Sequence, residues 1–224
     1  MDDEPTRDGE QHSFELGRRH VLAAGVAGLG LSALGTGTVG ASHSPADKVS
    51  AVGSTLELME STKSNGGESS AGAEVTLLSG TMKTSSPTDL ILQATVESGL
   101  YTDIKTKGND ESWANAGVQC WVEIDGAEVP VTSGSSGKVV FNNREFGMKT
   151  SNFENEEAMI ELFLRTRSSN AFNWLTLDVG SGEHTIELKA DIDVYANGKG
   201  SAKALVGPRT LVVEPTKMAN DAEI

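Results

Sequence analysis

The chain has 224 residues and is acidic, with 32 Asp and Glu residues against 18 Lys and Arg residues and a net charge of −14. Such a surface repels phosphate backbones and anionic lipid head groups, so we expect no binding to nucleic acid and no peripheral binding to membranes. Cys120 is the single cysteine, which excludes an intrachain disulfide, and the stability of the fold must therefore come from packing.

The first 41 residues have the layout of an export signal. Arg18 and Arg19 precede an uncharged run at positions 21–41, as a positively charged region precedes the apolar region of a signal peptide. Glycines interrupt this run repeatedly, and its weak hydrophobicity argues against a permanent membrane span. Small residues precede the end of the run, so we predict cleavage between Ala41 and Ser42.

This segment resembles a twin-arginine (Tat) signal, whose pattern is Ser or Thr, Arg, Arg, any residue, Phe, Leu and Lys. Arg18, Arg19 and Leu22 match the pattern, whereas positions 17, 21 and 23 depart from it. The resemblance implies that the Tat translocase exports the chain already folded, to the cell surface or the extracellular space. An uncleaved, membrane-anchored form is the less favoured alternative.

The acidic balance and the Tat-like signal together resemble exported β-sandwich proteins of salt-loving archaea, an uncharacterised family. Removal of residues 1–41 takes away six acidic residues and three arginines, which leaves 26 acidic and 15 basic residues. The remaining chain is therefore still strongly acidic. The resemblance implies that this charge keeps the protein soluble in strong brine.

The remainder of the chain is long enough for one sizeable core, and we expect one domain. Residues 42–52 are small and polar and are predicted to form a tether. Residues 53–214 are the predicted domain, and residues 215–224 are a C-terminal tail. Within the domain, the segment 61–72 is rich in Ser, Gly and Asn and is predicted to be a mobile loop.

Apolar and polar residues alternate along most of the domain, which is typical of strands with one face against a core. The longest alternation, at residues 185–195, predicts the central strand. Asp125-Gly126 lies between two alternating runs and predicts a tight hairpin, and Asn197-Gly198 predicts another turn. Ser151 and Glu154 fit a capping pattern that predicts one helical turn at residues 152–158.

About ten short strands with turn residues between them predict an all-β fold. Strands at near-regular spacing, with almost no helical period, favour an antiparallel β-sandwich of the jelly-roll or immunoglobulin-like type. The predicted signal helix precedes this domain. No internal repeat is visible in the sequence.

The residues argue against a metal, a cofactor and a catalytic centre. A blue-copper site needs two histidines and a cysteine with further ligands soon after it, yet only His43 and His184 follow the signal and no such ligands follow Cys120. Cys120 lies on the apolar face of its strand and is predicted to be a core residue. No Gly-x-Ser-x-Gly motif supports His184, a predicted turn residue, as a catalytic base.

The few aromatic residues include a candidate for sugar stacking. Trp113 is predicted to lie in a loop, Trp121 and Tyr195 on the polar faces of their strands, and Trp174 beside Asn173. Trp121 could equally be covered by a loop or by a second sheet. Two nearby carboxylates on one strand could contact a glycan or bind calcium, although solvated charge explains them as well. The candidate glycan contacts are Trp113, Trp121, Trp174, Asp191 and Asp193.

The expected function is therefore that of an exported, non-catalytic β-sandwich that serves as a cell-surface or extracellular structural or interaction module. One alternative is a carbohydrate-binding or carbohydrate-active domain. A second alternative is a filament subunit that polymerises by strand exchange, because edge strands are templates for pairing and a tail follows the last strand. The expected partners are a cell-surface protein, a glycan or further copies of the chain.

Overall fold

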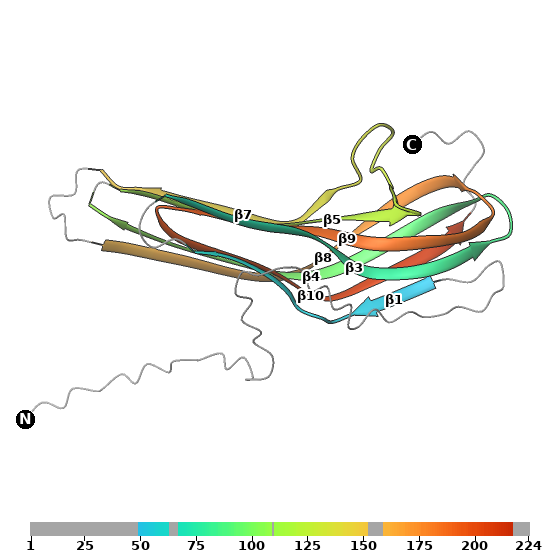
Figure 1. The fold of residues 1–224 in the computed structure, drawn as a ribbon, viewed down its shortest axis with the longest axis horizontal. Helices are drawn as coiled ribbons and strands as arrows, with labels where there is room; N and C mark the ends of the chain where they lie inside the picture. The colour runs from blue at the N-terminus through green and yellow to red at the C-terminus, as the bar shows by residue number, and fades with distance from the viewer. Residues whose placement is uncertain (1–48, 63–66, 109, 152–158, 217–224) are drawn as a thin grey trace, which may run out of the picture. The chain divides into compact units, whose positions relative to one another are not determined.

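The structure is a computed structural model that describes residues 49–62, 67–108, 110–151 and 159–216 (Figure 1). The predicted signal, its cleavage site and the predicted helical turn at 152–158 lie outside the described residues. Ten strands in the described part of the chain form two antiparallel sheets that pack face to face. The predicted all-β sandwich is thereby confirmed.

The first sheet, called the β10 sheet, has the order β1-β10-β4-β8, with β2 paired to β10 on the same side as β1. Because β1 pairs with residues 209–213 of β10 and β2 with residues 201–206, the two short strands line one edge in succession. The opposite edge is β8. The strands of this sheet are β1 (Val49–Gly53), β2 (Glu57–Thr62), β4 (Thr88–Lys107), β8 (Met159–Val179) and β10 (Lys199–Thr216).

The second sheet, called the β9 sheet, has the order β3-β9-β5-β6, with β7 also paired to β5. The strand predicted to be central, β9, lies between β3 and β5, which confirms its position. The strands of this sheet are β3 (Glu68–Thr84), β5 (Glu111–Ile124), β6 (Ala127–Glu128), β7 (Val139–Lys149) and β9 (Gly182–Asn197).

Two turns follow the predicted chemistry. Asp125 and Gly126 have φ angles of 53° and 80° and connect β5 to β6, as a two-residue hairpin with two positive φ angles requires. Gly198, with φ of 71°, connects β9 to β10. A side chain at Gly198 would also collide with the carbonyl oxygen of Glu111, 2.5 Å from the Cβ position. This turn therefore demands glycine for two separate reasons.

Several predicted boundaries were wrong. Most of the predicted loop at 61–72 is strand, because β2 continues to Thr62 and β3 begins at Glu68. β1 begins at Val49, so residues 49–52 of the predicted tether belong to the sheet, and Val49 and Ala51 lie in the core. The strands are also longer than predicted: β8 has 21 residues and β4 has 20.

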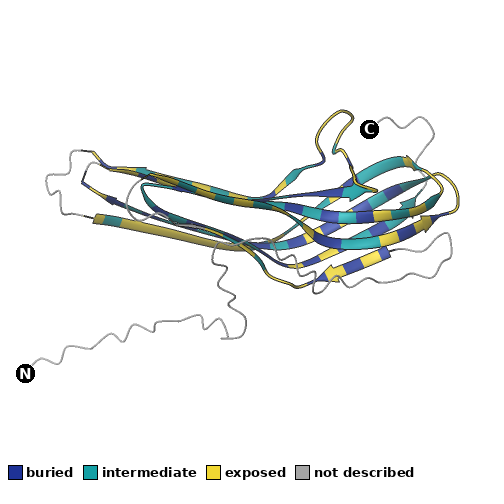
Figure 2. Ribbon diagram, viewed as in Figure 1, coloured by how far each residue is buried: buried dark blue, intermediate teal, exposed yellow. Residues whose placement is uncertain are grey.

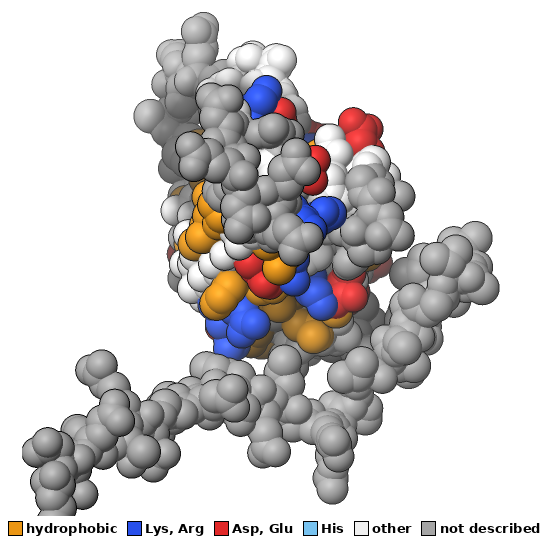
Figure 3. Space-filling view, turned by 90° about the vertical axis from the view of Figure 1, so that its left-hand side faces the viewer, with side chains coloured by type: hydrophobic (Ala, Val, Ile, Leu, Met, Phe, Trp, Pro, Cys, Tyr) orange, Lys and Arg blue, Asp and Glu red, His pale blue; other side chains and the backbone are white. Residues whose placement is uncertain are grey.

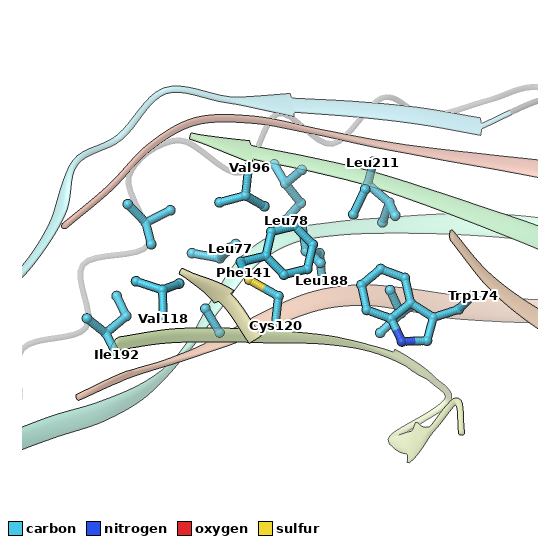
Figure 4. Close-up of a cluster of buried hydrophobic side chains, with 14 of the residues drawn as sticks. Leu77, Leu78, Val96, Val118, Cys120, Phe141, Trp174, Leu188, Ile192 and Leu211 are labelled. Carbon is cyan, nitrogen blue, oxygen red and sulfur yellow. The ribbon is translucent and has the colours of Figure 1, made fainter. Parts of the chain in front are cut away.

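The sandwich divides into two halves with different interiors. We call them the β1 half, where β1 pairs with the end of β10, and the β2 half, where β2 pairs with its beginning. Large apolar side chains fill the interior of the β1 half, including Leu92, Trp174 and Leu188. Figure 2 marks the buried residues along the strands, and Figure 4 shows Trp174 and Leu188 in the core. Burial of such side chains supplies most of the driving force for folding.

Small side chains dominate the interior of the β2 half. Ala116 on β5 and Ala204 on β10 are fully buried, and Thr102 and Thr106 on β4 also point inward. The side-chain oxygens of both threonines are buried without a hydrogen-bond partner in the described structure. An unpaired buried hydroxyl lowers stability, so the interior of this half contributes less to folding than that of the β1 half.

Arg209 lies at the junction of the two halves, where β10 is irregular between Val206 and Arg209 and β1 gives way to β2. Its side chain is buried and donates hydrogen bonds to the carbonyl oxygens of Leu77 at 3.2 Å, of Gly207 at 3.1 Å and of Thr55. Burial lowers the pKa of this guanidinium. One side chain thus satisfies backbone groups that the interrupted strands leave unpaired.

Candidate functional site

Trp174, a predicted glycan contact, is a core residue. Its side chain lies between the sheets, is 1% exposed and donates a hydrogen bond from Nε1 to the carbonyl oxygen of Gly137 at 2.7 Å. Its ring stacks on Phe141 with centroids 6.2 Å apart and meets Phe172 edge-on at 4.9 Å. The prediction was wrong because a ring enclosed in this way cannot reach a sugar (Figure 4).

Trp121 lies on the outer face of the β9 sheet, as predicted, but it is 1% exposed. Lys138 lies over the ring, with Nζ 4.1 Å from the centroid, and Nε1 donates to Glu123 Oε1 at 2.9 Å. The segment that precedes β7 therefore covers Trp121, which was the alternative considered for it. This side chain contributes a cation–π contact to the fold and offers no surface to a ligand.

Asp191 and Asp193 lie two residues apart on the outer face of β9, as predicted. Lys138 Nζ lies 3.8 Å from Asp191 Oδ2. Burial, and after it the charge of Asp191, raises the pKa of Asp193. Among the described residues, no group of three or more His, Cys, Asp and Glu side chains could hold a metal ion. The two carboxylates are thus placed as surface charge beside a lysine.

Trp113 is the one predicted aromatic contact that is accessible, although not in a loop. It lies on the outer face of β5 opposite Gly147 of β7, and 39% of it is exposed. The ring lies over the glycine: a Cβ atom at Gly147 would be 3.1 Å from Trp113 Cδ2. Nε1 donates to Glu111 Oε1 at 2.6 Å, and this bond, followed by one from Lys149, lowers the pKa of Glu111. The indole is therefore held in one orientation before any ligand arrives.

Trp113 borders two open hollows, one of about 460 Å³ and one of about 370 Å³. Tyr195 of β9 lies directly opposite Asn115 of β5 in the second hollow. An aromatic plane beside amide and carboxylate groups can stack on a sugar ring and hydrogen-bond its hydroxyls. We call this surface the Trp113 hollow, and its residues are Glu111, Trp113, Asn115, Glu145, Gly147 and Tyr195.

A second accessible surface is the first part of β8, which the sequence did not single out. Ile160, Leu162 and Leu164 alternate as core residues do, but they lie at the edge of the β10 sheet. The exposed fractions are 58% for Met159, 41% for Leu162, 62% for Phe163 and 42% for Leu164. We call residues 159–167 the β8 edge. Sequence alternation identifies a strand but not its place in the sheet, so this exposure was missed.

The β8 edge has distinct chemistry on its two faces. Met159, Glu161, Phe163, Arg165 and Arg167 share the outer face, while Ile160, Leu162 and Leu164 share the inner face. Arg165 lies over the rings of Tyr101 and Phe163, 5.1 and 5.9 Å from the centroids. Glu161 Oε1 lies 2.9 Å from Lys105 Nζ. Figure 3 shows hydrophobic and basic side chains side by side at this end of the sandwich.

The remaining candidate groups of the sequence have structural roles. Cys120 is fully buried, and burial raises the pKa of its thiol to about 12, which removes the thiolate needed for reaction. His184 lies in β9 rather than in a turn. Its Nδ1 is 2.7 Å from Asp125 Oδ2 and its Nε2 is 2.9 Å from the carbonyl oxygen of Gly180. Both ring nitrogens face acceptors, so the protonated imidazolium satisfies both, and its pKa is raised chiefly by the bond to Asp125.

No known protein family and no curated protein sequence matches the chain. Among solved structures, it is similar to the infectious bursal disease virus Gt strain structure, with 13% identity, a TM-score of 0.17, and coverage of 74% of this chain and 37% of the other. It is also similar to the VP2 subviral particle of infectious bursal disease virus, with 10% identity, a TM-score of 0.14, and coverage of 75% of this chain and 44% of the other. The chain thus spans less than half the length of these proteins. The strand pairing itself shows the β-sandwich.

In the described part of the chain, no helix has the length and apolar character needed to cross a membrane.

Proposed function

We propose that the protein is an exported, non-catalytic β-sandwich that works at the cell surface or outside the cell as a structural or interaction module. The observation that carries this proposal is the β8 edge, where four large apolar side chains are exposed along one strand. Exposed large apolar side chains that gather in one part of a protein surface are a feature of interaction sites. The Tat-like segment with Arg18 and Arg19 supports the location.

Cell fractionation tests the location. We expect the unaltered protein in the medium or on the cell surface, and the variant Arg18→Lys with Arg19→Lys as folded, full-length protein inside the cell. Arg7→Lys, which changes an arginine outside the pair, is the matched control and should be exported normally. Normal export of the double variant would contradict the Tat route. Retention of the unaltered protein inside the cell would contradict the whole proposal.

A second candidate function is carbohydrate binding, and the Trp113 hollow is the specific observation that favours it. The indole is partly exposed, fixed by Gly147 and Glu111, and bordered by Tyr195 and Asn115. Stacking of a base or ring on such a platform is worth about 1–3 kcal/mol by alanine substitution in nucleic-acid-binding proteins. A sugar ring has no π face, but the apolar C–H face of the ring can pack against the indole in a similar way.

A glycan array tests this second function. We expect binding by the unaltered protein and at least about a tenfold loss of affinity in Trp113→Ala, in line with a stacking contribution of that size. Phe163→Ala removes an exposed aromatic residue from the opposite sheet and should leave glycan binding unchanged. Binding that is equal in both variants would exclude the hollow as the site.

A further inference from the structure

The β8 edge has backbone groups that no described strand pairs with. β8 pairs with β4 on one side and ends the β10 sheet on the other. An unprotected edge of this kind is a template for another strand. Proteins usually protect such edges with proline, bulges or inward-pointing charge, whereas residues 159–164 read Met-Ile-Glu-Leu-Phe-Leu and place only apolar side chains on the inner face.

We propose that the β8 edge pairs antiparallel with the same edge of a second copy of the chain, about a twofold axis at Phe163, so that the β10 sheets of two copies become one continuous sheet. The proposal deepens the proposed function by naming a partner for that interaction surface, and it rests on the proposed role as an interaction module. It requires no group from outside the chain.

The charges of the edge support this register. In antiparallel pairing centred on Phe163, Glu161 of each copy lies directly opposite Arg165 of the other, on the outer face. Opposite charges that face each other across a pair of strands stabilise it, and like charges destabilise it. The twofold symmetry makes this contact twice, so the edge is complementary to itself in charge.

The apolar residues support the same register. Leu162 of each copy lies opposite Leu164 of the other on the inner face, and Phe163 lies opposite Phe163 on the outer face. A shift of the symmetry centre to Leu164 would place Phe163 opposite Arg165 and Leu162 opposite Thr166. A shift to Leu162 would place Glu161 opposite Phe163. The register centred on Leu164 would also place Glu161 opposite Arg167 and Leu164 opposite itself, but Arg167 already forms an ion pair with Glu97 of its own chain. The register centred on Phe163 makes two leucine pairs instead of one and uses Arg165, so it is the favoured one.

The other edge of the same sheet lacks this property. β2 carries Glu57 and Glu60 and no basic residue, so in a pair of β2 edges no basic residue of one β2 strand could lie opposite the acidic residues of the other. Glu60 is already 2.7 Å from Lys203 of the same chain, and Glu57 lies 4.0 Å from Arg209. We therefore expect a closed dimer through β8, because an isologous interface uses up the edge on both copies.

Disulfide capture tests the register directly. In the full-length protein carrying Phe163→Cys, the two cysteines lie on opposite strands at directly facing positions, which is within reach of a disulfide. We expect a covalent dimer under mild oxidation. Met159→Cys is the matched control, since it is equally exposed but would face Arg167 of the second copy, and it should remain uncrosslinked. The native Cys120 is buried and should not contribute.

Charge reversal tests the energetic argument, with analytical ultracentrifugation as the measurement. We expect the unaltered protein to sediment as a dimer. Glu161→Arg alone, or Arg165→Glu alone, should raise the dimer dissociation constant by roughly tenfold to hundredfold, because two attractive pairs become two repulsive ones. The combined variant should recover dimerisation. Lys203→Glu, on the same outer face but in β10, is the control and should dimerise normally.

Three results would overturn the proposal: a monomer at all concentrations tested, a dimer in which Phe163→Cys does not crosslink, or an open polymer that the β8 variants do not affect. A monomeric protein that is nevertheless exported and surface-bound would overturn this inference and leave the proposed function intact. A dimer that is retained inside the cell would support this inference and overturn the proposed location.

Discussion

The two halves of the sandwich share its long strands but fill the space between the sheets differently. In the β1 half, large side chains such as Trp174 and Leu188 interlock between the sheets, and the aromatic rings of Phe141 and Phe172 contact Trp174. In the β2 half, alanines and threonines make up much of the interior, beside a few larger residues such as Ile104, and several exposed apolar residues lie on the edge strand β8. Large buried side chains are thus concentrated in one half, and most of the exposed large apolar side chains lie in the other.

The largest effect should come from removing the central ring of the β1 half. Trp174→Ala should lower the free energy of unfolding by about 3–5 kcal/mol, because it leaves a cavity between the sheets and an unpaired carbonyl at Gly137. Urea unfolding measures this change. Phe163→Ala removes an exposed ring in the β2 half and should alter stability by no more than about 0.5 kcal/mol. Equal losses in the two variants would erase the distinction between the halves.

The β2 half should instead be sensitive to added volume. Ala204→Leu places a large side chain where the described interior holds small ones and should cost about 1–3 kcal/mol in urea unfolding. Lys203→Leu, the neighbouring position on the outer face, loses an exposed ion pair with Glu60 and should cost less than about 1 kcal/mol. If Ala204→Leu were stabilising, the sheets of the β2 half would have room for larger residues.

The smallest effect is pH-dependent and belongs to the β1 half. The bond to Asp125 raises the pKa of His184 above its ordinary value of about 6.5. The stabilisation of the folded state by protonated His184 is therefore complete below about pH 6.5 and is lost as the pH rises through the raised pKa. His184→Gln should therefore lower the melting temperature more at pH 5.5 than at pH 9, by an effect of about 1 kcal/mol or less. Asp125→Asn should show the same trend. A difference in melting temperature between variant and unaltered protein that grows toward high pH would contradict this prediction.

The sequence predicted features whose cause is local. Alternation along β9 depends on neighbouring side chains, and the turn at Asp125-Gly126 depends on two φ angles, so both were predicted correctly. The glycine-rich segment before Glu74 was mistaken for a loop because its strand partners are remote. Gly72 lies opposite Asp193, whose side chain occupies the space over the glycine. No property of residues 61–72 alone reveals this pairing.

The candidate sites show the same limit. Alternation placed Trp121 on the outer face correctly, but only the tertiary fold brings Lys138 over its ring. The position of Gly147 beneath the indole of Trp113 follows from the register between β5 and β7, which the sequence does not reveal. The exposure of Leu162 and Leu164 depends on which strand ends the sheet. The residue types suggested which aromatic side chains could bind a ligand. Whether each side chain is accessible depends on contacts with residues that are remote in the sequence.

The buried guanidinium of Arg209 makes the junction of the halves less sensitive to brine than the ion pairs on the surface. At 1 M salt the Debye length is about 3 Å, so exposed ion pairs such as Lys203–Glu60 lose most of their attraction. The hydrogen bonds from Arg209 end on the backbone carbonyls of Leu77, Gly207 and Thr55, and the side chain is 5% exposed. Dissolved ions screen such buried contacts much less than they screen exposed ion pairs. Salt should therefore weaken the contacts of Arg209 less than it weakens the ion pairs on the surface.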